Sequence, residues 1–466
     1  MKIDYLNILE QSNILVNGQL TARELTQQSL DTIARHNSDM HAFLNVMVDE
    51  ALAQADALDE TLARTGTPVG PLHGVPIAVK EELDVAGQRT SFGTNAVSKP
   101  ATADCEPVRR LRSAGAIIIG KTAMPEFGQW PLTESATNGY TRNPWNRAFS
   151  TAGSSGGTAA AVASGMVAAG LGGDGGGSIR LPAAWCGLFG LKPQRGRVSA
   201  APNKALWRGL GTYGALTRTV ADAALLYDIL ASHLPTDKYQ AAPWPEPLSV
   251  AIRRDPGRLR VLLAERPAEG GEANLERQTL AALHQVAEVL SAAGHDVDEG
   301  DLPLYKPGLT MTAQMAAGVM DELKLIDSVK QLESRTRQAI KVYRPAALLA
   351  GRAERRAASL AAHMFTIFDR YDLILTPTVA HPPLPVGQLD GKGLLGTIAI
   401  SLDMTAYTSV WNVLGNPAAA VPAGFTANGL PLSVQFVAAP NNEPLLIQVA
   451  AQIEAALPWA DKHPTL

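Results

Sequence analysis

Gly153-Ser154-Ser155-Gly156-Gly157 begins a glycine-rich part of this chain that continues through Gly173-Asp174-Gly175-Gly176-Gly177-Ser178 to Gly196. Glycine has no side chain, so a run of glycines lets backbone amide groups approach a bound molecule. The residues between the two runs are rich in alanine, which predicts a helix to about Ala169 and then a short strand. A turn, a helix, a strand and a loop in this order favour an α/β fold.

The same alternation of elements extends on both sides of this region. Upstream, Ile77-Ala78-Val79 is typical of a short buried strand that ends at Lys80, and Thr21-Ala22-Arg23-Glu24 is a capping box that begins a helix. Further strands are expected at about residues 116–119, 259–264, 295–297, 373–375 and 432–437, and helices at about 49–64, 104–113, 219–231, 275–292, 309–371 and 443–457. No linker or repeat interrupts the pattern, so we expect one continuous domain over residues 1–466.

The composition excludes several classes of function. The chain has 466 residues, of which 46% are hydrophobic and 18% charged, and its net charge of −4 predicts neither nucleic acid nor an anionic membrane as a partner. Met1-Lys2-Ile3-Asp4 lacks the apolar run of a signal peptide, and the apolar stretches are too short to span a membrane. Cys105 and Cys186 are too few for a disulfide framework and lack metal-ligand spacing. We therefore expect a cytoplasmic protein without a bound metal.

Several known motifs contain glycine and serine, and the sequence excludes most of them. A phosphate-binding P-loop requires Gly-Lys followed by Ser or Thr, but no lysine lies between Gly153 and Leu191. Neither run fits a dinucleotide-binding fingerprint, and no serine stands three residues before a lysine, as β-lactamases require. The nucleophile-elbow pattern does match, with Ser155 at its centre. It would require an acid and a downstream histidine, and the candidates leave this alternative open: His233, His284, His295, His363, His381 and His463.

The second glycine run predicts acyl transfer. That chemistry requires backbone N–H groups that point toward the oxyanion of the transition state, and the loss of one such donor costs about 3 kcal/mol. Gly175, Gly176 and Gly177 stand directly before Ser178 and are candidates for these donors, with Ser178 as the nucleophile. The simpler alternative is a tight turn in which Ser178 caps the next helix. Three glycines alone do not decide between the two.

A much longer set of residues resembles the amidase signature family. The matching segments are the two glycine runs, Ile179-Arg180, Pro182-Ala183-Ala184, Cys186-Gly187, Gly190-Leu191-Lys192-Pro193, Gly196-Arg197-Val198-Ser199, Gly415-Asn416-Pro417-Ala418 and the upstream lysine block Gly74-Val75-Pro76-Ile77-Ala78-Val79-Lys80. The resemblance implies a single large α/β/α domain, in which helices flank a mixed central sheet. The signature core then covers about residues 68–199, and a more variable region of about 200–400 shapes the substrate pocket.

The resemblance also implies a catalytic triad. By position, Ser178 is the nucleophile, Ser154 follows a cis peptide bond and relays protons, and Lys80 is the base. Free lysine has a pKa near 10.4, so Lys80 acts as a base only where burial disfavours its charge, which suits the apolar residues before it. The alternative is a structural ion pair of Lys80 with a neighbouring carboxylate, for which three are available: Glu81, Glu82 and Asp84.

Two charged residues flank the glycine loop. By analogy with the family, Asp174 and Arg180 brace the loop through hydrogen bonds, which would hold the N–H donors in place. The sequence departs from the family pattern at Gly175, where many relatives carry Thr or another side chain, and at Glu81, where Asp is common.

Together these features predict an amidase that cleaves the C–N bond of a small amide or carbamate through a serine acyl-enzyme, without metal or cofactor. Relatives span aryl acylamidases and urethanases, and an esterase side activity is compatible with the same chemistry. The alternatives are a glutaminase-like subunit of a tRNA-dependent amidotransferase, which needs partner chains, and a non-catalytic scaffold. We expect the pocket to form from segments after the signature and around Trp130–Tyr140. The sequence does not indicate an oligomeric state.

Overall fold

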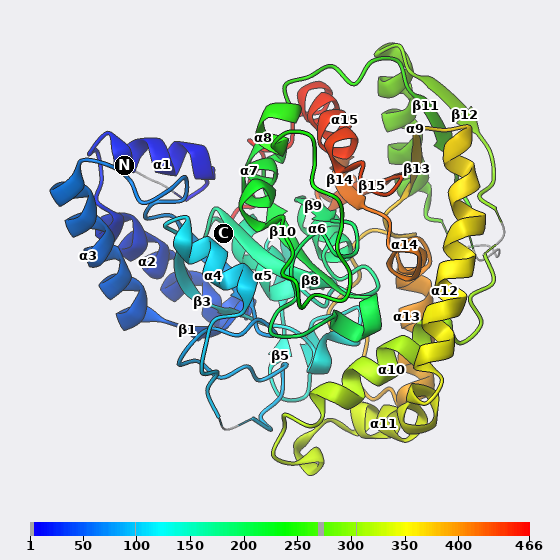
Figure 1. Ribbon diagram of the computed structural model, residues 1–466, viewed down its shortest axis with the longest axis horizontal. Coiled ribbons are helices and arrows are strands. Elements are labelled where there is room, and N and C mark those ends of the chain that lie inside the picture. The colour runs from blue at the N-terminus through cyan, green and yellow to red at the C-terminus, as the bar shows by residue number, and fades with distance from the viewer. Residues whose placement is uncertain (1–3, 98, 269–274, 304) are drawn as a thin grey trace.

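The computed structural model describes residues 4–97, 99–268, 275–303 and 305–466, and a mixed sheet forms its centre (Figure 1). Residues 1–3, where we expect no signal peptide, lie outside the described residues. Within the described residues, the sheet has 11 strands in the order β1-β3-β2-β8-β10-β9-β14-β15-β13-β11-β12. These strands are β1 (Phe43–Val46), β2 (Pro76–Lys80), β3 (Ile117–Thr122), β8 (Ala169–Asp174), β9 (Phe189–Lys192), β10 (Thr212–Thr217), β11 (Arg260–Leu263), β12 (Asp296–Glu299), β13 (Leu373–Pro377), β14 (Ala418–Phe425) and β15 (Pro431–Ala438). Two short pairs lie apart from it, β4 (Glu134–Ser135) with β5 (Gly139–Tyr140) and β6 (Arg142–Asn143) with β7 (Asn146–Ser150).

Helices cover both faces of the sheet, because successive residues of a strand point to opposite faces. The helices are α1 (Ile8–Val16), α2 (Ala22–Met40), α3 (Val48–Thr65), α4 (Glu106–Ser113), α5 (Gly156–Ala163), α6 (Arg180–Cys186), α7 (Val220–Leu230), α8 (Leu248–Ala251), α9 (Arg277–Ala292), α10 (Thr310–Glu322), α11 (Ser334–Ala347), α12 (Ala350–Met364), α13 (Leu394–Thr405), α14 (Ser409–Leu414) and α15 (Glu443–Ala456). Ile77 and Val79 belong to the core that includes α4, α7, α9 and α15, whereas Ala78 belongs to the core with α2, α3 and α5. The expected mixed sheet with flanking helices is confirmed.

The helices α10, α11 and α13 lie beside the sheet, on the right in Figure 1. They bury Ala316, Ile340 and Met404 in a separate cluster that also contains Trp130 and Trp185. This cluster joins the middle of the chain to the helix α6, which follows the second glycine run, so the two parts are held together by apolar packing.

The pairing of β2 with β8 determines where polar side chains gather. The two strands are parallel neighbours, with Ile77 opposite Ala169 and Val79 opposite Leu171. Their carboxyl ends therefore lie at the same edge of the sheet, which is where α/β proteins usually bind ligands. Lys80 ends β2 and Asp174 ends β8, so the topology brings the lysine block to the second glycine run.

Most of the predicted elements are present, but some boundaries differ. The capping box is confirmed, because Thr21 Oγ1 accepts the N–H of Glu24 at 3.0 Å while the Glu24 carboxylate accepts the N–H of Thr21 at 2.8 Å. The alanine-rich helix was expected to reach Ala169 but ends at Ala163. Gly165, with φ of +72°, turns the chain there, and Ala169 begins β8 instead.

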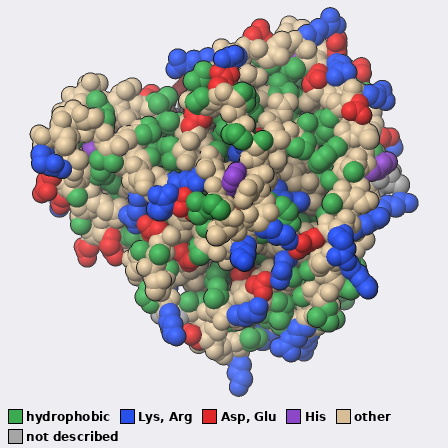
Figure 2. All heavy atoms as spheres, viewed as in Figure 1, with side chains coloured by type: hydrophobic (Ala, Val, Ile, Leu, Met, Phe, Trp, Pro, Cys, Tyr) green, Lys and Arg blue, Asp and Glu red, His purple; other side chains and the backbone are tan. Residues whose placement is uncertain are grey.

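The surface agrees with the weak net charge. Figure 2 shows acidic and basic side chains interspersed over one face of the molecule. No helix in the described part of the chain is both long enough and apolar enough to span a bilayer.

Candidate active site

Lys80 lies at the end of a fully buried strand, as its apolar approach predicts. Its side chain is 1% exposed, and its Nζ lies 2.7 Å from Ser154 Oγ and 3.4 Å from the carbonyl oxygen of Gly173. The same Nζ lies 3.2 Å from Glu82 Oε1. Lys80 therefore contacts both one of the predicted site serines and one of the carboxylates of the ion-pair alternative.

The two adjacent serines have different surroundings. The Gly153–Ser154 peptide bond is cis, and the Ser154 hydroxyl faces Lys80. Ser155 Oγ instead donates to the carbonyl oxygen of Gly173 at 3.2 Å. None of the histidines that the structure describes is hydrogen-bonded to Ser155, so the geometry gives no support to a nucleophile elbow centred on it.

Ser178 lies in the turn between β8 and α6. Its carbonyl oxygen accepts the N–H of Ser155 at 3.1 Å, and its side chain is partly exposed. Among the described residues, none forms a hydrogen bond with its hydroxyl, and α6 has no side-chain cap. The capping role for Ser178 was therefore wrong. Ser178, Ser154 and Lys80 together line a small cavity of about 30 Å³.

Asp174 and Arg180 form a buried ion pair behind this turn. Arg180 Nε lies 2.9 Å from Asp174 Oδ2, and Nη2 lies 2.9 Å from Oδ1, which is a bidentate geometry. Asp174 also accepts the N–H of Gly177 at 2.8 Å and the N–H of Ile179 at 3.2 Å. The pair thus holds the backbone on both sides of Ser178.

Three residues from the C-terminal part of the chain complete this network. Asn412 Nδ2 donates to the backbone and side-chain oxygens of Asp174, both at 2.9 Å, while Arg180 donates to Thr408 O at 3.0 Å and to Gln435 Oε1 at 2.7 Å. Burial opposes the charge of Asp174, but the adjacent guanidinium of Arg180 outweighs it and holds the pKa of Asp174 below its usual range. Sequence reasoning missed these three residues, because no local pattern marks them.

The backbone N–H groups of the glycine run are not equivalent. The N–H of Gly177 already donates to Asp174, and Gly177 has a φ of +133°, which favours glycine. The N–H groups of Gly175 and Gly176 donate to no other residue in the described part of the chain. The Gly176 carbonyl accepts the Thr408 hydroxyl at 2.7 Å, which fixes the peptide plane from the other side. Two donors in this run are therefore free to bind a ligand oxygen.

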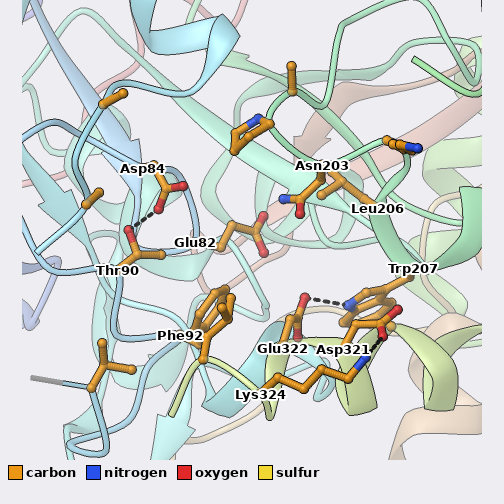
Figure 3. Close-up of a pocket in the computed structure, with 18 of the residues that line it drawn as sticks. Glu82, Asp84, Thr90, Phe92, Asn203, Leu206, Trp207, Asp321, Glu322 and Lys324 are labelled. Carbon is orange, nitrogen blue, oxygen red and sulfur yellow. Dashed lines mark hydrogen bonds and ion pairs between the residues drawn. The ribbon is translucent and has the colours of Figure 1, made fainter. Parts of the chain in front are cut away.

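A larger cavity of about 1320 Å³ adjoins the small one (Figure 3). The two share four lining residues, Glu82, Leu206, Trp207 and Glu322. The larger cavity is lined by residues from 82–106, 201–213, 318–327 and Lys238, so segments after the signature do contribute, as expected. Among the described residues that line it, none belongs to Trp130–Tyr140, and that part of the expectation was wrong. Trp130 and Leu132 of this segment instead pack into the cluster with α10 and α11.

The departure at Gly175 has a structural reason. A Cβ atom on Gly175 would lie 2.7 Å from the ring of Trp207, so the indole occupies the space that a side chain would need. Trp207 Nε1 then donates to Glu322 Oε1 at 3.0 Å. Neither Trp207 nor Glu322 was predicted, since both lie outside the signature core and no local pattern marks either of them.

No group of three or more His, Cys, Asp or Glu residues suited to a metal ion occurs in the described ranges. Cys105 and Cys186 are both free thiols and buried. Burial raises the pKa of the Cys105 thiol to about 12 and that of Cys186 still further, so neither is a ready nucleophile.

Comparison with known proteins gives a consistent set of matches. The family model described as Amidase matches residues 24–447. The putative amidase AmiB2 of Mycobacterium tuberculosis is 42% identical over 464 residues, which cover 98% of this chain and 97% of that protein. The 6-aminohexanoate-cyclic-dimer hydrolase of Paenarthrobacter ureafaciens is 33% identical over 484 residues, with 98% and 96% covered. A solved structure of 6-aminohexanoate cyclic dimer hydrolase with its substrate superposes with a TM-score of 0.91 at 29% identity and covers 99% of each chain.

Proposed function

Because this chain belongs to the amidase signature family, and is therefore a hydrolase that acts on amides, we propose that it cleaves them through an acyl-enzyme on Ser178. One observation carries the proposal. Lys80 Nζ lies 2.7 Å from Ser154 Oγ at a cavity that Ser178 also lines. A nucleophile next to a hydroxyl that is itself bonded to a buried amine is a typical arrangement for activating serine.

In the proposed reaction, Ser178 Oγ attacks the carbonyl carbon while its proton passes to Ser154 and the proton of Ser154 passes to Lys80. The tetrahedral intermediate collapses as the relay returns a proton to the departing nitrogen, and water then releases the acyl group by the same steps. We propose the free N–H groups of Gly175 and Gly176 as the oxyanion donors. Gly177 contributes its backbone conformation, since its own N–H is bonded to Asp174.

Two effects oppose each other at Lys80. Burial disfavours a charge on its amine, whereas the Glu82 carboxylate at 3.2 Å favours one. The base role therefore requires that the pair with Glu82 loosens when a substrate occupies the cavity. This requirement distinguishes the proposal from a purely structural ion pair.

We propose aryl amides, small carboxamides and carbamates as substrate classes, because all three present a carbonyl carbon bonded to nitrogen. The purified chain should be assayed with a p-nitroanilide, a carbamate, an ester and glutamine. We expect Ser178→Ala to lower kcat/KM for the best substrate by at least about 10³-fold. Ser155→Ala is the matched control, because Ser155 is a buried neighbour that does not contact Lys80. Full activity in Ser178→Ala, or hydrolysis of glutamine alone, would overturn the proposal.

A further inference from the structure

Two carboxylates, Glu82 and Glu322, lie where the two cavities meet. Figure 3 shows them with Trp207 and Phe92 on the walls of the larger cavity, whereas the carboxylate of Asp84 is bonded to Thr90. Glu82 comes from the segment after β2 and Glu322 from the end of α10, so two distant parts of the chain supply the charge. Both line the small cavity with Lys80, Ser154 and Ser178.

Glu322 has only half of its hydrogen-bonding capacity used. Its Oε1 accepts from Trp207 Nε1 at 3.0 Å, but its Oε2 is buried and has no hydrogen-bond partner among the described residues. In the same part of the chain, no Lys or Arg lies within ion-pair distance of Glu322. A buried carboxylate oxygen without a partner is costly, so it usually marks a place for a ligand or an ion.

Several other acids of the larger cavity are paired with lysine or arginine, unlike Glu322. Asp321, directly before Glu322, pairs with Lys324 at 2.6 Å and with Arg208 at 3.2 Å. Glu106 likewise pairs with Arg109 and Arg110, both at 2.7 Å. Glu82 pairs with the ammonium of Lys80 at 3.2 Å, and Asp84 accepts the hydroxyl of Thr90 at 2.6 Å. Glu322 is therefore the acid at this junction that has no cationic partner among the described residues.

The surrounding backbone is shaped to hold Glu322 in this position. The Trp207 ring lies between Gly175 and Gly318, where added Cβ atoms would approach it to 2.7 and 2.3 Å. Trp207 and Arg208 have φ values of +42° and +55°, a region that side-chain-bearing residues rarely adopt. Strain of this kind is retained mainly at functional sites, and here it places an indole against a carboxylate.

We propose that Glu322 and Glu82 bind an ammonium group of the substrate, so that the preferred substrates are amides carrying a protonated primary amine. This inference rests on the proposed function of Ser178. An ammonium has three donors, which suits the unused oxygen of Glu322 together with Glu82, and the nearby indole adds a face that attracts cations. A carboxylate at the same place would be repelled.

Without a bound cation, the electrostatics of the site disfavour a charge on Glu322. Burial, and then the neighbouring Glu82 carboxylate, raise the pKa of Glu322 well above its usual range. A bound cation would favour its charged form. A cation beside Glu82 would also compete with Lys80 for that carboxylate, which is the loosening that the base role requires.

The test compares ω-aminoalkanoyl p-nitroanilides of three to six carbons with their isosteres, in which a methyl group replaces the ammonium. We expect kcat/KM for the best ammonium substrate to exceed that of its isostere by about 10-fold or more. Glu322→Gln, which keeps an acceptor for Trp207, should lower this ratio about 10-fold, mainly through KM. Glu288→Gln is the matched control, because Glu288 is exposed on α9 and outside both cavities, and it should leave the ratio unchanged.

A measurement on the unmodified protein tests the ammonium site without a variant that must first fold. Hexylamine should inhibit hydrolysis of the neutral anilide competitively and at least about 10-fold more strongly than hexanol. Equal cleavage of both series, with Ser178→Ala inactive on each, would overturn this inference and leave the proposed function standing. Cleavage that persists in Ser178→Ala would overturn the proposed function instead.

Discussion

Asp174 and Glu322 are two carboxylates that line the same small cavity and have opposite surroundings. Asp174 lies directly before Gly175, and its carboxylate is bonded to a guanidinium, an amide side chain and three backbone N–H groups. Glu322 reaches Gly175 through Trp207, which is also its only hydrogen-bond donor in the described part of the chain. One pKa is held low by a cation, whereas the other is raised by burial.

The difference separates two uses of a buried acid. A fully paired carboxylate fixes the geometry around it, since each lone pair is occupied and the charge is compensated. A carboxylate with a free oxygen is poised for a group that the folded chain does not supply. On this account Asp174 positions the loop of Ser178, and Glu322 recognises the substrate.

Lys80 lies between the two regions, and its removal should have the largest effect. We expect Lys80→Met to lower kcat/KM about 10⁴-fold, because the relay through Ser154 loses its base. Lys121→Met is the matched control, since Lys121 is equally buried but bonds to Arg89 and Thr90 rather than to Ser154. The folded fraction of the Lys121→Met protein can be measured by fluorophosphonate titration. For that fraction, kcat/KM should be within about 10-fold of the value for the unmodified chain. Equal losses in both variants would assign Lys80 a structural role.

Replacing each carboxylate by its amide tests the comparison directly. Asp174→Asn leaves the Arg180 guanidinium buried without a counter-charge and should cost about 3–5 kcal/mol in the free energy of unfolding. Glu322→Gln replaces a carboxyl group that has no cationic partner among the described residues, and it should change that free energy by less than about 1 kcal/mol. Urea unfolding of both variants at pH 7 provides the measurement. Similar losses would erase the distinction between the two acids.

Glu126 is another buried carboxylate, and no lysine or arginine of the described residues forms an ion pair with it. It is fully buried, accepts the N–H of Glu333 on both oxygens at 3.0 and 3.1 Å, and burial raises its pKa to about 7 from 4.5. Between these two pH values, Glu126 keeps its proton in the folded state but loses it in the unfolded state. The stabilisation by protonated Glu126 is therefore complete below pH 4.5 and is lost as the pH rises through 7. The slope reaches at most about 1.4 kcal/mol per pH unit.

Unfolding free energies of the unmodified chain and of Glu126→Gln should be compared between pH 4.5 and 7.5. We expect Glu126→Gln to become more stable relative to the unmodified chain as the pH rises, because the amide has no proton to lose. A difference that is constant over this range would show that Glu126 is charged in the folded state.

Gly175→Ala should act on the Glu322 side alone. Its Cβ would meet the Trp207 ring at 2.7 Å, so the indole must move, at a cost of about 1–3 kcal/mol. KM for an ammonium substrate should rise more than kcat falls. A fall in kcat with unchanged KM would place the effect on the oxyanion donors instead.

The part of the site that could be predicted lies in continuous motifs. Lys80 follows an unbroken apolar strand, and the glycine run before Ser178 is informative because glycine there leaves backbone N–H groups accessible. The pairing of Asp174 with Arg180 was anticipated by analogy with the family. Glu82 was considered only as one of three partners for Lys80, and the structure selects it.

The rest depends on tertiary packing, which local patterns do not encode. Asn412 reaches Asp174 from α14, and Glu322 reaches the cavity from α10, far from the signature in sequence. The strand β14 was also missed, because Ala418–Phe425 contains alanine, proline and glycine and has low strand propensity. It forms a strand because its buried position between β9 and β15 overrides that propensity.

The most direct test of the central claim is to trap the acyl group and locate it. A p-nitrophenyl ester or anilide that reacts with the chain should be quenched in acid within the first turnover, digested and mapped by mass spectrometry. The account predicts one acyl adduct, on Ser178, that forms at least about 10³-fold more slowly in Ser154→Ala and Lys80→Met. An adduct on Ser155 or Ser154, or unchanged acylation of Ser178 without Lys80, would contradict it.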